Sequence, residues 1–126
     1  MLTEELRTTA RALGEALRSH EAVQKYLKTS ADCTADAEAV DLEDRLLALY
    51  AELTSRQQRG ETLQREEIDV FHALRRQVYE HPRIAGREAA ATLAKPYFAE
   101  IADEINLQLG VEFAALAQAT DAEERA

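Results

Sequence analysis

Apolar side chains recur at helical spacing along most of this chain of 126 residues. The clearest series is formed by Leu42, Leu46, Leu49 and Leu53, which step by four, three and four positions. This period places the leucines on one side of a helix, while charged and polar residues fill the other sides. The pattern predicts a long helix over residues 37–58, which Gly60 ends.

Shorter patterns of the same kind predict helices on both sides of the leucine series. One covers residues 3–18, and a short second helix follows with Ser19 as its N-cap. We interpret residues 29–36 as a loop, because they are mostly polar and carry no large apolar side chain. A fourth helix, capped by Thr62, ends at the His81-Pro82 break, since a residue before proline avoids helical geometry.

The last helix is predicted to begin near Arg83 and to be long. Its apolar residues keep a seven-residue repeat from Ile84 to Ile105. Pro96 interrupts this segment and predicts either a kink near residues 92–93 or a fresh helix start. Gly110 is expected to end the regular part.

Together these patterns predict an all-α fold, an elongated antiparallel bundle of about five helices of which two are long. Residues with β-branched side chains are few, which disfavours a sheet. We expect one domain over residues 1–119, followed by a disordered acidic tail at 120–126. Helices this long expose more apolar surface than a chain of this size covers by itself, so we also predict a homodimer with a two-fold interface.

The net charge of −9 and the single cysteine limit the possible classes of function. An acidic chain does not concentrate on phosphate backbones, which argues against direct binding of nucleic acid. Cys33 cannot form an internal disulfide and suits a reducing compartment. No apolar run approaches the ~18 residues of a membrane span, and the N-terminus does not resemble a signal peptide. A cytoplasmic protein is therefore the simplest interpretation.

Few residues have the spacing that catalytic or metal-binding motifs require. Asp69 and His72 have the carboxylate-x-x-His spacing of di-iron bundles, but no second pair of this kind is present. A small metal- or ligand-binding bundle with its site at Asp69 and His72 therefore stays an alternative. Cys33 has no base or oxyanion site near it in sequence, so we interpret it as a passive thiol. Helix capping or solvent exposure explains His20 and His81, and we predict no catalytic residue, no cofactor and no metal.

The basic residues concentrate around the His81-Pro82 break. This region contains Arg75, Arg76, Arg83 and Arg87, with Tyr79 among them. These residues are our candidates for binding a partner. Two alternatives stay open, namely RNA binding through the four arginines and internal ion pairing with Glu80, Glu88 and the acidic helices.

Three segments of the chain carry a family resemblance. They read ALGEALRSHEAVQKYLKTS, DLEDRLLALYAELTSRQQRGE and VYEHPRIAGREAAATLAKPYFAEIADEI. The familiar points are the helix border at His20, the long helix that ends at Gly60, and the break at His81-Pro82. In these segments, which span about residues 6–116, the chain resembles the YlbF/YmcA family of small bacterial helical proteins.

The resemblance implies an all-α fold with long antiparallel helices, usually dimeric, and no enzymatic activity. It also implies a regulatory adaptor, as in members that adjust RNase Y-dependent RNA processing, competence, sporulation and biofilm formation. Some members are associated with iron–sulfur clusters, which need several thiolates, whereas this chain offers only Cys33. No functional residue is carried over from the family. We therefore predict a cytoplasmic homodimeric adaptor that contacts another regulatory protein through its surface.

Overall fold

The computed structural model describes residues 1–118, and this part of the chain is all-α, as predicted. Five helices follow one another: α1 Glu4–Arg18, α2 Glu21–Thr34, α3 Ala37–Gln58, α4 Arg65–Glu80 and α5 Pro82–Leu109. The two long helices are α3 and α5, with 22 and 28 residues. A short helix over residues 113–118 follows α5. The tail predicted at 120–126 lies outside the described residues.

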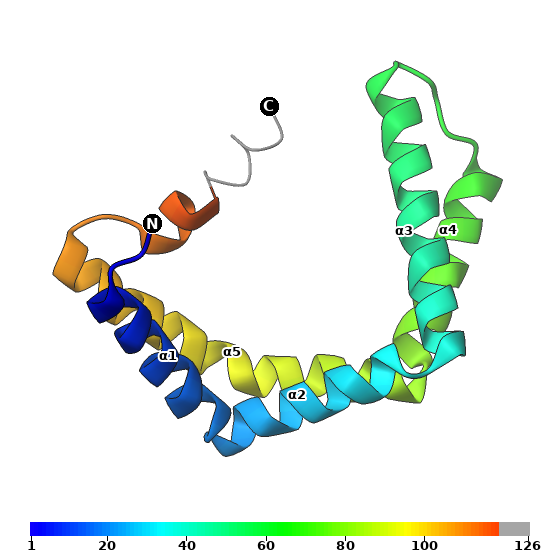
Figure 1. Cartoon of the computed structure of the whole chain (residues 1–126). Coiled ribbons are helices and arrows are strands. Elements are labelled where there is room, and N and C mark those ends of the chain that lie inside the picture. The colour runs from blue at the N-terminus through cyan, green and yellow to red at the C-terminus, as the bar shows by residue number, and fades with distance from the viewer. Residues whose placement is uncertain (119–126) are drawn as a thin grey trace. The chain divides into compact units, whose positions relative to one another are not determined.

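Two compact units make up the chain, the first over Met1–Ala91 and the second from Thr92 onward. The first unit holds α1 to α4 and the start of α5. Within it, α3 and α4 lie side by side as an antiparallel hairpin (Figure 1). Gly60, with a φ of 84°, turns the chain after α3, which confirms the predicted helix end.

The helix α5 continues through Pro96, so the fresh helix start considered from the sequence is wrong. Proline has no N–H to donate to the carbonyl four residues earlier, which here belongs to Thr92. Thr92 is also the first residue of the second unit. The boundary between the units therefore coincides with the helical hydrogen bond that Pro96 removes.

Side chains next to each helix start satisfy backbone N–H groups that the helix itself leaves unpaired. Thr3 accepts from the N–H of Leu6 at α1, and Asp36 accepts from Ala39 at α3. The Nδ1 atoms of His20 and His81 accept from Ala22 and Arg83, each at 3.2 Å, at the starts of α2 and α5. Both histidines are therefore caps, which is one of the two explanations that the sequence left open.

Two predicted caps are wrong. Ser19 ends α1 instead of starting α2, and its hydroxyl donates to the carbonyl of Ala16. At α4 the N-cap is Gln64 and not Thr62, because the carboxylate of Glu67 accepts from the Gln64 N–H at 2.9 Å.

The predicted loop at residues 29–36 is also wrong, because α2 continues to Thr34. The hydroxyls of Thr29 and Thr34 donate to carbonyls one turn earlier in the same helix, so these polar side chains are satisfied without breaking it. Cys33 is 1% exposed and gives this last part of α2 a buried contact.

The core of the first unit forms where the end of α2, the start of α3, the end of α4 and the start of α5 meet. It consists of Cys33, Ala39, Leu42, Val78 and Ile84, with Leu46 and Leu74 packed against it. In the leucine series of α3, Leu42 and Leu53 are buried and the two leucines between them are half-buried. The long amphipathic helix predicted from this series is confirmed.

Many large apolar side chains nevertheless stay exposed on the single chain. No residue of α1 is buried, and Leu6 on its apolar side is 57% exposed. In the second unit, Leu93 and Leu107 are 60% and 76% exposed. None of the helices within residues 1–118 is both long and apolar enough to cross a membrane.

Candidate functional site

Arg87 of α5 lies at the centre of a polar cluster that joins three helices of the first unit. Its Nη1 donates to Oε1 of Glu43 in α3 at 2.9 Å, and its Nη2 makes a second, short hydrogen bond to Oε2 of the same carboxylate. Nη2 also donates to Glu88 at 3.0 Å. The two parallel bonds to Glu43 form the bidentate geometry that makes arginine–carboxylate pairs strong.

Cys33 of α2 completes this cluster. Its Sγ lies 3.4 Å from Nη1 of Arg87, which donates to it, and 3.9 Å from Oε1 of Glu43, to which the thiol donates. The side chain is 1% exposed. The thiol is therefore held in one orientation between a guanidinium and a carboxylate.

The electrostatics of the cluster favour a neutral thiol beside a charged pair. Burial raises the pKa of Cys33, and the positive charge of Arg87 opposes this shift only in part. The hydrogen bonds from Arg87 lower the pKa of Glu43. A buried neutral thiol is a poor nucleophile and a poor metal ligand. The cluster therefore suits a structural role, in which its hydrogen bonds hold α2, α3 and α5 together.

Sequence reasoning found Arg87 and named Cys33, but it missed their partner Glu43. Glu43 follows Leu42 on the polar side of a predicted amphipathic helix, where a carboxylate normally faces water. The burial of Cys33 could have been predicted from its spacing. It lies ten residues, nearly three helical turns, after the buried Val23, and so close to the same side of α2. Treating cysteine as an apolar residue would have extended α2 to its observed end.

The structure separates the five candidate partner-binding residues into two groups. Arg87 is turned inward, with its side chain 20% exposed, and Arg83 is 3.5 Å from Asp32. For these two arginines the alternative of internal ion pairing holds. Within residues 1–118, neither Arg75 nor Arg76 forms an ion pair, and both are exposed on α4.

The exposed members of the set lie together on one side of α4. Here Arg75, Arg76 and Tyr79 line a shallow hollow, which we call the α4 hollow, together with His72 and Glu80. Tyr79 is 51% exposed. Exposed arginine next to exposed tyrosine is typical of protein-binding surfaces.

The Asp69–His72 pair acquires no further ligand in the part of the chain that is described. There, no group of three or more histidine, cysteine, aspartate or glutamate side chains is placed to hold a metal ion. The ring of His72 instead packs edge-on against Phe71, with 5.7 Å between the ring centroids. The geometry around His72 therefore gives no support to the alternative of a metal-binding bundle.

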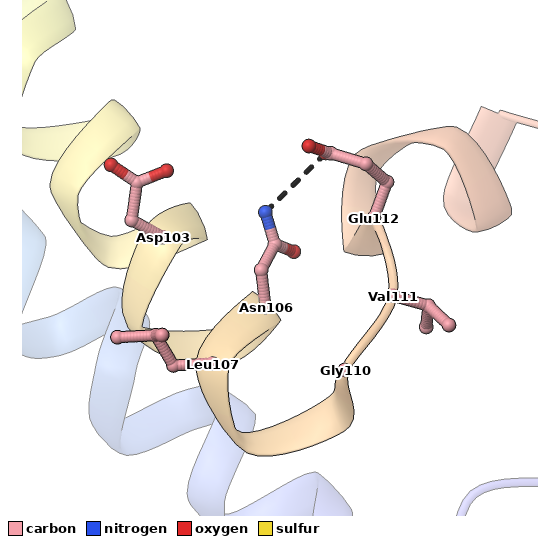
Figure 2. A pocket seen from close by; sticks show the side chains of 6 residues that line it. All are labelled: Asp103, Asn106, Leu107, Gly110, Val111 and Glu112. Carbon is pink, nitrogen blue, oxygen red and sulfur yellow. Dashed lines mark hydrogen bonds between the residues drawn. The ribbon is translucent and has the colours of Figure 1, made fainter.

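A second hollow lies in the second unit, at the end of α5 (Figure 2). Asn106 organises it: its Nδ2 donates to Glu112 at 3.3 Å, and its Oδ1 accepts from the N–H of Phe113 at 2.8 Å. Gly110, with a φ of 76°, turns the chain between them, which confirms the predicted end of the helix. Asn106 thus caps the short helix over residues 113–118, and its polar atoms are used within the turn.

Comparison with known protein families identifies the chain. A family model described as "Control of competence regulator ComK, YlbF/YmcA" matches residues 6–109, which include most of α1 and all of α2 to α5. This chain belongs to the YlbF/YmcA family. The resemblance inferred from the sequence is thereby confirmed. No curated protein and no solved structure matches the chain significantly.

Membership in the YlbF/YmcA family supports a regulatory role, because the family is described by its control of a regulator. It is not a known enzyme family. The YlbF/YmcA match also covers both the Cys33–Glu43–Arg87 cluster and the α4 hollow.

Proposed function

We propose that the chain is a regulatory adaptor that acts by contact with other proteins and catalyses no reaction itself. The main support for an adaptor is that some arginines of the chain are paired inside the fold while others are exposed on its surface. Arg87 is used inside the fold, whereas Arg75 and Arg76 stay exposed beside Tyr79 on α4. A surface of this composition suits recognition of another macromolecule better than conversion of a small substrate.

Its partners in this proposal are a second copy of the chain and another regulatory protein. Large apolar side chains of α1 and of the second unit, such as Leu6, Leu93 and Leu107, are exposed on the single chain and are available for contact with a second copy. By its family, the adaptor is proposed to act in the cytoplasm on competence control and on RNase Y-dependent RNA processing. Sporulation and biofilm formation are the further processes that the family resemblance suggests.

Direct RNA binding is the weaker candidate. Two of its four arginines, Arg83 and Arg87, are already in ion pairs, and the chain has a net charge of −9. Only Arg75 and Arg76 are left to meet phosphates, and two contacts give weak, salt-sensitive binding. A protein partner therefore fits the α4 hollow better.

The adaptor proposal is tested in a native host strain from which the gene has been deleted. The wild-type chain, Arg75→Ala/Arg76→Ala and the control Arg65→Ala are each expressed in it, with Arg65 being an exposed residue of α4 outside the hollow. Wild type and the control should restore RNase Y-dependent transcript ends and expression of competence genes, while the double variant should not.

Circular dichroism checks that the double variant is folded. Unchanged transcripts and competence-gene expression in the deletion strain would refute the regulatory proposal. Full restoration by a folded double variant would instead refute the α4 hollow as the contact surface.

A further inference from the structure

One side of α5 in the second unit is exposed from Leu93 to Leu107. Its residues recur at intervals of four, three, four and three positions, and residues at such intervals lie on one side of a helix. We call this side the α5 stripe; it is made of Leu93, Tyr97, Glu100, Glu104 and Leu107, with Asp103 one turn before Leu107. The leucines at its two ends are 60% and 76% exposed.

The middle of the α5 stripe is acidic. Glu100, Asp103 and Glu104 have no ion-pair partner within residues 1–118. Lys95 is the one basic residue between positions 92 and 118, and it lies two positions after Leu93, where the helix turns its side chain away from the stripe. The α5 stripe therefore has apolar ends and an uncompensated negative centre.

The α5 stripe ends at the hollow drawn in Figure 2. Asp103 and Leu107 line this hollow together with Glu112 and Val111, which is 52% exposed. The carboxylate of Glu112 accepts from the uncharged amide of Asn106, so its charge is not neutralised by that contact. The hollow thus adds a shallow recess for an apolar side chain and one more negative charge to this end of the stripe.

These charges decide which occupants fit the α5 stripe. The phosphates of nucleic acids and of membrane surfaces are anionic, so the three carboxylates repel them. A second copy docked through the same stripe would bring carboxylates against carboxylates, and like charges that meet in an interface oppose binding. Leu6 and the exposed side of α1 do not carry this restriction and stay available for a second copy. The occupant that complements the stripe is a basic segment of another protein.

We propose that the α5 stripe binds a basic amphipathic helix of another protein. Apolar residues of that helix cover Leu93 and Leu107, and its lysine or arginine side chains pair with the carboxylates between them. A helix fits better than an extended segment, because it satisfies its own backbone N–H and C=O groups and the side of α5 offers no row of backbone groups to pair with. From the rise of a helix per residue the stripe is about 21 Å long, so a partner helix of about four turns covers it.

This inference goes beyond the proposed function, because it gives the adaptor a second contact surface. The α4 hollow presents the cations of Arg75 and Arg76, whereas the α5 stripe presents carboxylates. Surfaces of opposite charge select different partner segments, since each repels the segment that suits the other. A chain with both surfaces is suited to bind two different partners.

Fluorescence anisotropy of a labelled synthetic peptide tests the inference on the full chain. The probe is a helical leucine–lysine peptide of about 18 residues, with lysines in the middle and leucines at both ends of one helix side. The control peptide has the same composition in scrambled order. At about 0.15 M salt, where attraction between distant charges is screened, the chain should bind the ordered peptide at least roughly tenfold more tightly, because only that peptide presents both residue types on one side.

Two variants with the same net charge separate the α5 stripe from the overall acidity of the chain. Glu100→Lys/Glu104→Lys reverses the charge of the stripe and should weaken binding of the ordered peptide at least roughly tenfold. The matched control Asp44→Lys/Glu52→Lys reverses two exposed carboxylates of α3. It should change the affinity by less than about threefold, because these charges act only through the screened long-range field.

The apolar ends of the stripe are tested without a change in charge. Leu93→Ser/Leu107→Ser should weaken binding of the ordered peptide at least roughly fivefold, because the two leucines no longer bury apolar surface against it. Circular dichroism verifies the fold of every variant. Glu100→Gln/Glu104→Gln and Leu93→Ala/Leu107→Ala replace the corresponding variants if those do not fold.

Three results would overturn the inference. The first two are equal binding of the ordered and scrambled peptides, and equal binding of the ordered peptide by wild type and by a folded stripe variant. The third is a loss of self-association of Leu93→Ser/Leu107→Ser in sedimentation equilibrium, because it would assign the stripe to a second copy.

All three results leave the adaptor proposal standing, since that proposal is tested through Arg75 and Arg76 in the deletion strain. Conversely, peptide binding that the stripe variants weaken, together with unchanged transcripts and competence-gene expression in the deletion strain, would refute the adaptor proposal and keep the stripe as a binding surface.

Discussion

Replacing Arg87 by alanine should destabilise the first unit much more than replacing Arg83, although both changes remove an arginine from an ion pair. Arg87 makes two hydrogen bonds to Glu43 and one to Glu88. Among residues 1–118, the side chain of Arg83 has one ion-pair partner, Asp32, at 3.5 Å. Loss of Arg87 therefore leaves the half-buried carboxylate of Glu43 beside the buried thiol of Cys33 without its cationic partner.

The burial of each pair sets the expected magnitude. The side chains of Arg87 and Glu43 are 20% and 30% exposed, against 56% and 41% for Arg83 and Asp32. Breaking a fully buried pair costs about 3–5 kcal/mol and an exposed pair contributes about 0.2–1 kcal/mol. For this partly buried pair we expect a loss of about 2 kcal/mol for Arg87→Ala and of about 0.5 kcal/mol for Arg83→Ala.

Urea denaturation followed by circular dichroism at 222 nm measures both losses. In thermal melts the same change for Arg87→Ala should lower the Tm by roughly 8 °C, since about 1 kcal/mol corresponds to about 4 °C in a chain of this size. Replacing both partners, as in Arg87→Met/Glu43→Leu, should recover much of the stability, because no unpaired charge stays buried. Equal effects of Arg87→Ala and Arg83→Ala would refute the reasoning.

The same pair gives the wild-type chain a defined dependence on pH. Arg87 lowers the pKa of Glu43 in the folded chain below its unfolded value of about 4.3. The unfolded chain therefore binds the proton first, so the stabilisation is complete above about pH 5 and is lost as the pH falls through the folded pKa. The free energy of unfolding of Arg87→Ala, measured by denaturation at several pH values, should therefore change less across this acidic range than that of the wild type. If both proteins showed the same change with pH, Arg87 would not be the cause of the lowered Glu43 pKa.

Two further predictions concern the core. Cys33 should react with a chromogenic thiol reagent at least roughly tenfold more slowly in the folded than in the denatured chain, because the residue is 1% exposed and burial raises the pKa of its thiol. Equal reaction rates in the two states would show that the thiol is accessible in the folded chain. Leu42→Ala should cost roughly 2–5 kcal/mol, since Leu42 is 4% exposed. The control Leu27→Ala, at a position 46% exposed, should stay within about 0.5 kcal/mol in the same urea titration.

The helices that the sequence predicted best are those whose apolar period is long. The series from Leu42 to Leu53 predicted the existence and the buried side of α3, because apolar residues at helical spacing over three turns fit a helix and not a strand. Gly60 and Gly110 marked real turns because their φ angles of 84° and 76° belong to a region that other residues avoid.

The helix starts were harder to predict, since several polar residues near each start can serve as the cap. Ser19 and His20 are neighbours, and only the folded geometry makes the imidazole the acceptor at α2. The end of α2 was missed because Thr29 and Thr34 read as loop residues, although their hydroxyls donate within the helix.

The candidate site was predictable in composition but not in geometry. Four arginines and a tyrosine could be grouped from the sequence, yet nothing along the chain shows that Arg87 turns inward toward Glu43, 44 positions away. Such a pairing is a tertiary contact without local periodicity. The exposed residues Arg75, Arg76 and Tyr79 could be placed together because they share one helical face at spacings of three and four residues.

The two histidine caps have a chemical consequence. A ring nitrogen that accepts a hydrogen bond carries no hydrogen, so the neutral rings of His20 and His81 both hold theirs on Nε2. For His81 that hydrogen lies on the side of Asp36, whose Oδ2 is 3.9 Å from Nε2. A methyl group or a metal ion on Nδ1 would therefore take the place of the backbone N–H that each ring accepts at the first turn of α2 or α5.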